Sequence, residues 1–130
     1  MANKYARAVG GNWNTDATWS TTSGGGADTT KPTASDDVFI QATSGNVTID
    51  AASAAKSVDC TGYTGTLTHN AFTLTVSGSV TLVSGMTYTL ANSATSAIIM
   101  NATGTITTGG KTLGNFTCSS GTITLGDNLT

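Results

Sequence analysis

Charged residues are scarce in this sequence of 130 residues, and so are some of the residues that favour helices. Only 9% of the chain is charged, against roughly 25% in an ordinary soluble domain. The acidic residues are all Asp, so Glu is absent. Disordered chains carry high net charge, which means that this composition excludes a solvated, disordered tail. The lack of Glu and the few Lys residues also disfavour long helices.

Clustered positive charge and long apolar runs are missing as well. The net charge is -2, and the five cations are scattered at Lys4, Arg7, Lys31, Lys56 and Lys111. A sequence-independent grip on nucleic acid needs several cations close together, so nucleic acid is excluded as a partner. No apolar run approaches the roughly 18 residues of a transmembrane helix, and we expect no membrane partner.

The first residues also lack the apolar core of a secretory signal. We therefore expect a protein that is made and kept in a cytoplasm, or that leaves the cell by assembly or lysis.

Threonine and glycine are abundant, with 28 and 16 copies. Between residues 58 and 90, apolar residues alternate with threonine and other polar residues. Because side chains of a strand point to opposite faces with a period of two, this pattern predicts short strands with one apolar and one threonine face. The predicted core consists of Leu67, Phe72, Leu74, Val76, Val80, Leu82, Met86, Tyr88, Leu90, Ile106 and Ile123.

A Gly-Thr-apolar-Thr element recurs along the chain. It begins at Gly65, Gly104 and Gly121, with a looser copy at Gly78, so the spacing is uneven. Stacked coils of variable length fit this pattern, and the fold class we predict is all-β: a short β-solenoid of four or five coils. The alternative is an antiparallel β-sandwich. Asn-Gly and Asp-Gly hairpin turns are missing between the strands, which favours the solenoid.

Two segments differ in composition. Residues 1–35 hold both tryptophans, Trp13 and Trp19, and are expected to form an irregular cap over one end of the β-core. The other interpretation of this tryptophan pair is a partner contact or an aromatic platform for sugar. Residues 36–130 form the predicted solenoid, within which only 51–57 is compatible with a helical turn or a loop. The pattern stops at the C-terminus without a polar cap, so we expect a longer protein or a covering chain.

Side chains that could perform catalysis or bind a metal are few, and we predict no catalytic site, no metal and no cofactor. His69 is the only histidine and is expected in an exposed turn. Asp50 and Asp59 form the best candidate for a paired-carboxylate site. Asp residues in the segments 36–37 and 126–128 are expected to serve in turns rather than to bind Ca²⁺.

The two cysteines, Cys60 and Cys118, lie two residues after Val58 and Phe116. They therefore share the apolar side of their strands, and we expect two buried free thiols. A disulfide between them stays open, because the sequence does not fix their separation.

The order of motifs resembles that of a known group of proteins. The motifs are Gly11-Asn12-Trp13 with Trp19, Pro32, Asp36-Asp37-Val38, and the segments 46–50, 56–68 and 74–82. This order resembles the threonine-rich, β-helical structural proteins of tailed bacteriophages, and also the solenoid parts of bacterial surface adhesins. The missing secretory signal favours the phage group.

The resemblance implies a non-enzymatic virion component, either a capsid decoration or head fibre or the base of a tail fibre or spike. Its implied partners are other virion proteins and sister chains, commonly as a homotrimer. The alternative function is a carbohydrate-binding adhesin module that contacts host glycans through Trp13 and Trp19. A fragment of a polysaccharide-degrading enzyme is the third hypothesis.

Overall fold

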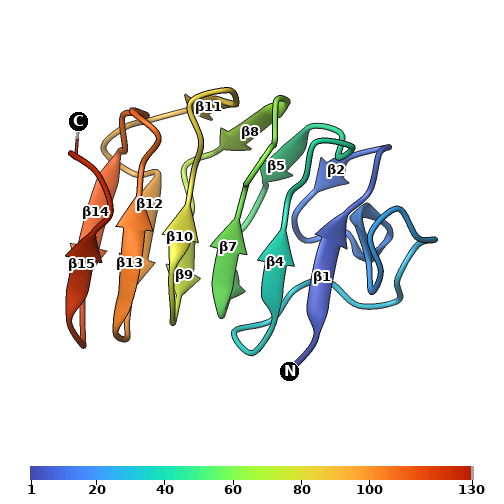
Figure 1. The fold of residues 1–130 in the computed structure, drawn as a ribbon, viewed down its shortest axis with the longest axis horizontal. Coiled ribbons are helices and arrows are strands. Elements are labelled where there is room, and N and C mark those ends of the chain that lie inside the picture. The colour runs from blue at the N-terminus through green and yellow to red at the C-terminus, as the bar shows by residue number, and fades with distance from the viewer. Residues whose placement is uncertain (130) are drawn as a thin grey trace.

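The computed structural model describes residues 1–129, in which the regular structure is fifteen short strands and one 3-10 turn, η1 (Asp16–Thr18). The strands form three sheets (Figure 1). Sheet A contains, in spatial order, β15 (Ile123–Leu125), β13 (Gly104–Thr107), β10 (Val80–Thr81), β7 (Ser57–Asp59), β4 (Asp37–Phe39), β1 (Asn3–Ala6) and β3 (Trp19–Ser20). Sheet B contains β11 (Thr87–Leu90), β8 (Thr66–His69), β5 (Val47–Ile49) and β2 (Gly11–Asn12). Sheet C contains β14 (Asn115–Cys118), β12 (Ala97–Met100), β9 (Thr73–Val76) and β6 (Ser53–Ala55).

From β4 onward the chain visits the three sheets in turn, so that each coil lies on the previous one. The coils are β4-β5-β6, β7-β8-β9 and β10-β11-β12; β13 and β14 follow without a sheet B strand between them. Every pairing between coils is parallel, and the one antiparallel pair, among the described residues, joins β1 to β3. The predicted short β-solenoid is confirmed, with about four turns.

The coils differ in length but keep one register. Val38, Val58, Val80, Ile106 and Leu125 are successive partners in sheet A, so the repeat is 20, 22, 26 and 19 residues. The differences lie in the corners, which is why the Gly-Thr-apolar-Thr element is unevenly spaced. Its copies also fall on two sheets, since the strand after Gly65 lies in sheet B and the one after Gly78 in sheet A.

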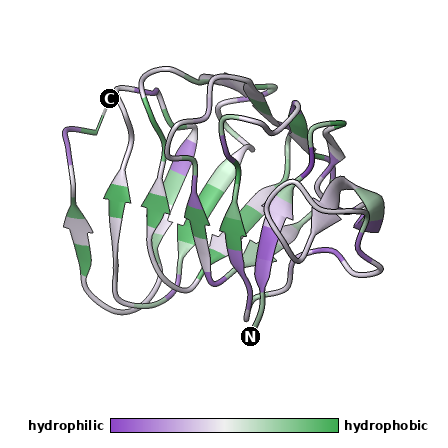
Figure 2. Cartoon of the chain, turned by 45° about the vertical axis from the view of Figure 1, so that its right-hand side comes forward, coloured by the Kyte–Doolittle hydropathy of each residue, from purple (hydrophilic) through white to green (hydrophobic). Residues whose placement is uncertain are grey.

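Alternation in the strands decides which side chains face inward, and apolar positions repeat at the same level from coil to coil (Figure 2). Seven predicted core residues are at most 2% exposed: Leu67, Leu74, Val76, Val80, Leu82, Met86 and Ile106. Tyr88, Leu90 and Ile123 are only partly buried. These three lie in β11 and β15, which are the outermost strands of sheets B and A among residues 1–129.

The prediction that Phe72 lies in the core is wrong, since it is 40% exposed. Its spacing from Leu74 gives it inward parity, but it lies in the bend between β8 and β9. Side chains alternate between the two faces only where the backbone is extended, and the bend turns this ring toward solvent.

The N-terminal segment is more regular than predicted. Strands β1 and β2 are already the first strands of sheets A and B, and β3 closes the edge of β1. Residues 51–57, expected as a helical turn or loop, contain β6 and the start of β7. Within residues 1–129, no helix has the length and apolar character needed to cross a membrane.

Candidate interaction surfaces

The N-terminal end of the stack is sealed by the two tryptophans. Trp13 and Trp19 are both 0% exposed and meet edge to face, with ring centroids 5.0 Å apart. They belong to the same apolar cluster as Val38 and Ile40 in the first coil. An indole buried on all sides offers no face for stacking on a sugar ring. The interpretation of these residues as a sugar platform is therefore wrong.

A buried charge also marks this end. Lys4 is the register partner of Val38, so it occupies an inward position, and it is 4% exposed. Its Nζ donates to the Asp28 carboxylate, to the Thr30 carbonyl at 2.9 Å and to the Thr30 hydroxyl at 2.7 Å. The Lys4 hydrogen bond is the main cause that lowers the pKa of Asp28. This contact ties the loop before β4 onto strand β1.

Asp36, just before β4, also connects the N-terminal residues to the loop before β4. Its carboxylate accepts from Ala2 N at 3.0 Å, Thr33 N at 2.9 Å and Thr33 Oγ1 at 2.7 Å. Burial is the largest influence on its pKa and raises it, but these hydrogen bonds outweigh burial and the pKa is lowered. Asp36 therefore fixes a turn, as the sequence predicts for this segment.

His69 is not an exposed turn residue, so that prediction is wrong. It is the last residue of β8 and 0% exposed, because it keeps the inward parity of Leu67. Its Nδ1 lies 2.6 Å from the Tyr88 hydroxyl and its Nε2 lies 2.8 Å from the Phe72 carbonyl. A carbonyl only accepts, so Nε2 carries the proton and Nδ1 accepts from Tyr88. Burial lowers the pKa of His69 and holds it neutral.

The two cysteines are free and differ in exposure. Cys60 is 0% exposed, and burial, followed by the nearby Asp59 charge, raises its pKa to about 12. Cys118 is exposed, so the prediction that it is buried is wrong. Its parity is inward, since Met100 is its register partner and is 0% exposed. Cys118 lies, however, in β14, which is the outermost strand of sheet C among residues 1–129.

The candidate carboxylates each accept main-chain hydrogen bonds, Asp59 within its own turn and Asp50 and Asp127 from other segments of the chain. The Asp50 carboxylate accepts from Asn14 N at 3.0 Å, and that of Asp59 accepts from Thr61 N at 2.8 Å. They follow or lie in strands of different sheets, B and A, and the structure records no contact between them. The Asp127 carboxylate accepts from the main-chain nitrogens of residues 108 and 109, both at 2.7 Å. No three potential metal ligands come together in the part of the chain that the structure describes.

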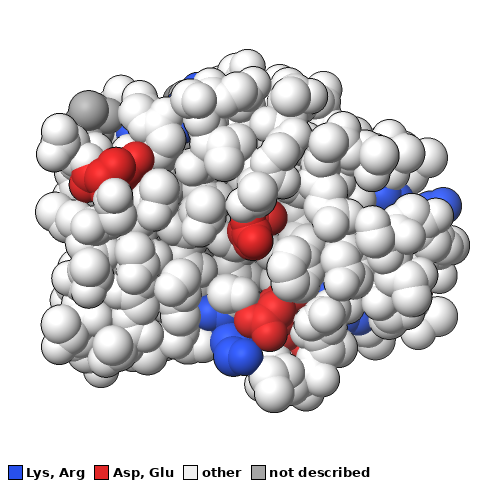
Figure 3. All heavy atoms as spheres, in the orientation of Figure 1, with Lys and Arg blue, Asp and Glu red and all other residues white. Residues whose placement is uncertain are grey.

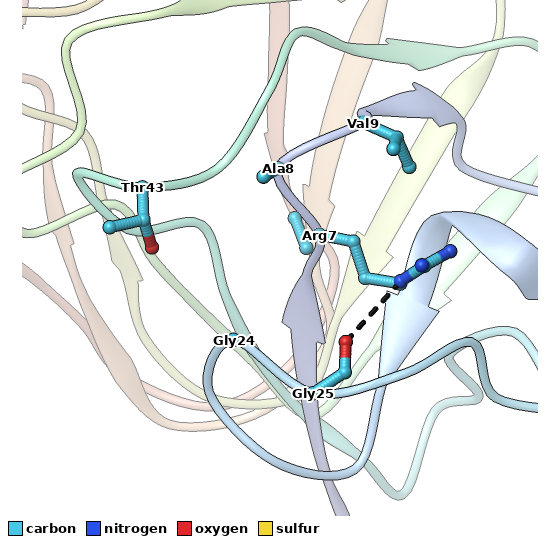
Figure 4. A pocket seen from close by; sticks show the side chains of 7 residues that line it. Arg7, Ala8, Val9, Gly24, Gly25 and Thr43 are labelled. Atoms are coloured by element: carbon cyan, nitrogen blue, oxygen red, sulfur yellow. Dashed lines mark hydrogen bonds between the residues drawn. The ribbon is translucent and has the colours of Figure 1, made fainter.

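A small pocket lies beside the cap, between the end of β1 and the loop at 24–25 (Figure 4). Its volume is about 250 Å³, and small residues, Val9 and Arg7 line it. The Arg7 guanidinium is engaged with main-chain oxygens, at 3.4 Å from Gly25 O and 2.8 Å from Ala17 O. Arg7 thus holds the surrounding loop in place, and the pocket has no other charged side chain in its lining.

Sheet B carries the most regular outer surface, which we call the hydroxyl face. Its outward side chains form two files, one of Asn12, Thr48, Thr68 and Thr89 and one of Thr66 and Thr87. The four strands of this sheet contain no Asp, Lys or Arg. Figure 3, which views the molecule from the side of sheet A, shows few charged groups there too. The hydroxyl face is thus a flat, uncharged array of threonines.

The C-terminal end of the stack is open, in contrast to the N-terminal end. We call it the open end; it comprises β14, β15 and the residues up to Leu129. Strand β15 pairs only with β13 and β14 only with β12 among residues 1–129. Leu125 and Leu129 are 53% and 44% exposed there. Within the described residues, these side chains and the outer edges of β14 and β15 have no neighbouring strand.

Together these features define the class of the protein, a three-sheet parallel β-solenoid whose first coil is covered by the tryptophan-containing segment. In the comparisons with known proteins, no family model, curated protein or solved structure matches the chain significantly.

Proposed function

We propose that this chain is a non-enzymatic structural component of a tailed-phage virion, acting through multivalent contacts with other virion proteins. The hydroxyl face is the observation that carries the proposal. Files of threonine at the spacing of β-strands, about 4.8 Å, form a rigid surface that needs no induced ordering to bind a protein. The resemblance of the motif order to that of phage structural proteins is the reason for proposing a tailed-phage virion as the assembly.

The chemistry of the side chains agrees with a role through shape. The groups that most often perform catalysis, His69 and the Cys60 thiol, are both 0% exposed and built into the core. Trp13 and Trp19 are equally enclosed, so they support the cap and give no support to the adhesin alternative. What the molecule offers to a partner is a set of flat faces, in which threonine methyl and hydroxyl groups alternate with few charges.

The decisive experiment is to count copies of the chain in purified particles from its source by quantitative peptide mass spectrometry. Hundreds of copies per particle identify a capsid decoration. A few to a few dozen identify a fibre, spike or tail part. Absence from particles ends the proposal.

A pair of variants then tests the face itself. Thr68→Lys with Thr89→Lys places two like charges on adjacent strands of the hydroxyl face, so we expect incorporation into particles to fall sharply. Thr81→Lys is the control, because Thr81 faces outward on sheet A beside its register partner Asp59. If both variants are incorporated like the parent chain, the hydroxyl face is not the contact.

A further inference from the structure

Two charged residues are buried at the N-terminal end of sheet A. Lys4 is 4% exposed and Asp36 is 7% exposed, and no other charged residue among residues 1–129 is buried to this extent. Lys4 pairs with Val38, and Asp36 lies two residues before Val38, so both side chains leave from the inward face of the sheet. Burial of a charge is costly unless the charge is paired, so each of these residues requires a partner.

The partner of Lys4 is Asp28, in the loop before β4. The Lys4 Nζ contacts the Asp28 carboxylate, and the two side chains are only 5% and 12% exposed. The main chain holds Asp28 in place, since its nitrogen donates to Trp19 O at 2.8 Å. An amine nitrogen and a carboxyl carbon are therefore kept next to each other where little water reaches them. This is the arrangement that amide formation between two side chains requires.

Asp36 places a second carboxylate near the same nitrogen. The Lys4 charge is one of the causes that lower the pKa of Asp36, so this carboxylate lies within electrostatic reach of the Lys4 Nζ. Its position is fixed by the donors Ala2 N, Thr33 N and Thr33 Oγ1. A carboxylate has about four acceptor sites, so these three donors leave room for a proton.

We propose that Lys4 and Asp28 join in the folded chain through an intramolecular amide bond, with Asp36 as the proton carrier. A proton first moves from the Lys4 ammonium to the Asp28 carboxylate, and the free amine attacks the carboxyl carbon. Asp36 then takes a proton from the nitrogen and passes it to the departing hydroxyl group. One N–C bond forms, one C–O bond breaks and one water molecule leaves. Nothing is oxidised or reduced, and the net charge of the pair is zero before and after.

Burial and proximity both favour this reaction. The pair starts as an ion pair, because the contact with Lys4 lowers the pKa of Asp28. Transfer of one proton inside the pair replaces two buried charges by a neutral amine and a neutral acid, which a poorly hydrated site favours. Two groups held in the right geometry react as if their concentration were on the order of 10⁵ M or more.

The ion pair between Lys56 and Asp37 provides an internal comparison. Its nitrogen and oxygen are 3.2 Å apart, but its side chains are 45% and 23% exposed. Water reaches this pair and stabilises both charges, so we expect it to stay ionised and unlinked. The two pairs therefore differ in burial.

The bond would close residues 4–28 into a covalent ring that contains both tryptophans. It would join strand β1 to the loop before β4 and so hold the tryptophan-containing segment in place. Like a disulfide, such a link restricts the unfolded chain and stabilises the folded one. The inference does not depend on the proposed virion function, because the bond requires only the folded chain.

The test is mass spectrometry of the purified chain of 130 residues. The intact mass is expected to lie below the sum of the residues by the mass of one water molecule. Trypsin cleaves after Arg7, so the segments that contain Lys4 and Asp28 separate unless they are linked. We expect a single linked peptide, with the bond located at these two residues by fragmentation. A folded chain with its full mass overturns the proposal, and so does loss of water with the two peptides separate, which would be an imide.

Variants test the chemistry. Lys4→Arg keeps the charge but should restore the full mass, with folding checked by circular dichroism. Asp28→Asn should react by the same attack with loss of ammonia, and so should reach the same mass as the linked parent chain. A merely structural contact would leave that variant unlinked. If neither variant folds, the linked peptide of the parent chain decides the question.

A third variant tests the proton carrier. Asp36→Asn retains an oxygen acceptor for the turn but carries no proton, so the linked fraction of freshly expressed chain should fall at least about tenfold. A linked fraction equal to that of the parent chain would overturn the role of Asp36. Loss of a second water molecule, with Lys56 joined to Asp37, would contradict the requirement for burial.

Discussion

The indole nitrogen of Trp19 donates a hydrogen bond of 2.8 Å to the main-chain oxygen of Trp13, six residues earlier. The same two residues hold their rings edge to face at 70°, fully enclosed. Residues 13–19 thus make both a hydrogen bond and an aromatic contact within one short segment. Both rings also pack on the first coil, so we expect these contacts to contribute to the free energy of unfolding.

Replacing either tryptophan by alanine should destabilise the fold by about 3–5 kcal/mol, as expected for a large buried aromatic. The phenylalanine variants separate the two roles. Trp19→Phe removes the donor to Trp13 O, whereas the Trp13 Nε1 has no acceptor among the described residues. We therefore expect Trp19→Phe to cost more than Trp13→Phe in urea unfolding. Equal losses would show that the hydrogen bond contributes nothing measurable.

The register of the core predicts a contrast between neighbours on β9. Leu74 is 1% exposed and lies between Ser53 and Ile98, so Leu74→Asp leaves an unpaired charge in the core and should prevent folding. Thr75 faces outward, and Thr75→Val should be nearly neutral. Circular dichroism and urea unfolding distinguish the two. Similar behaviour of both variants would mean that the alternation is assigned to the wrong faces.

Two glycines allow a test of how closely the coils approach. A Cβ at residue 104 would overlap the carbonyl oxygen of Gly78 in the coil beneath. Gly104→Ala should therefore cost about 1–3 kcal/mol through overpacking. A Cβ at Gly26 meets nothing within 4 Å, and its φ is not positive, so Gly26→Ala serves as the control with little or no loss. Thermal unfolding of both variants measures the difference, and equal midpoints would contradict the close stacking.

His69 should make stability depend on pH in the weakly acidic range. Its pKa in the folded state is lowered below the ordinary 6.5, so the unfolded chain binds a proton first as pH falls. The free energy of unfolding should therefore decrease as pH falls below about 6.5 and continue to decrease down to the folded pKa. Urea unfolding at several pH values between 8 and 4.5 measures this slope.

A variant without the titrating ring provides the control. His69→Gln should be less stable at pH 8, because it loses the contacts with Tyr88 and Phe72, but should lack the slope. Asp28 and Asp36 have pKa values lowered from 3.8, and their contribution is lost only as pH falls through that value and below. A parent chain whose stability is flat from pH 8 to 5 would contradict the buried, neutral His69.

The residues of the strands determined the fold class by themselves. Alternation of period two, as in Thr73-Leu74-Thr75-Val76, specifies which side chains face inward, since the extended backbone permits no other arrangement. The recurring glycines with no hairpin turns then distinguish stacked coils from a sandwich. His69 obeys the same alternation with Leu67, and its burial could have been read from that spacing.

Tertiary structure decided everything that depends on a residue's place in the stack. Cys118 and Leu125 occupy the same inward-facing positions as their register partners Met100 and Ile106, yet they are exposed, because within residues 1–129 no strand pairs with the outer edges of β14 and β15. Phe72 is exposed because a corner interrupts the strand that its spacing implies. The two tryptophans are enclosed because they pack on each other and on the apolar cluster of the first coil. Parity is a local property of the backbone, whereas burial requires a neighbour, and only the assembled coils provide one.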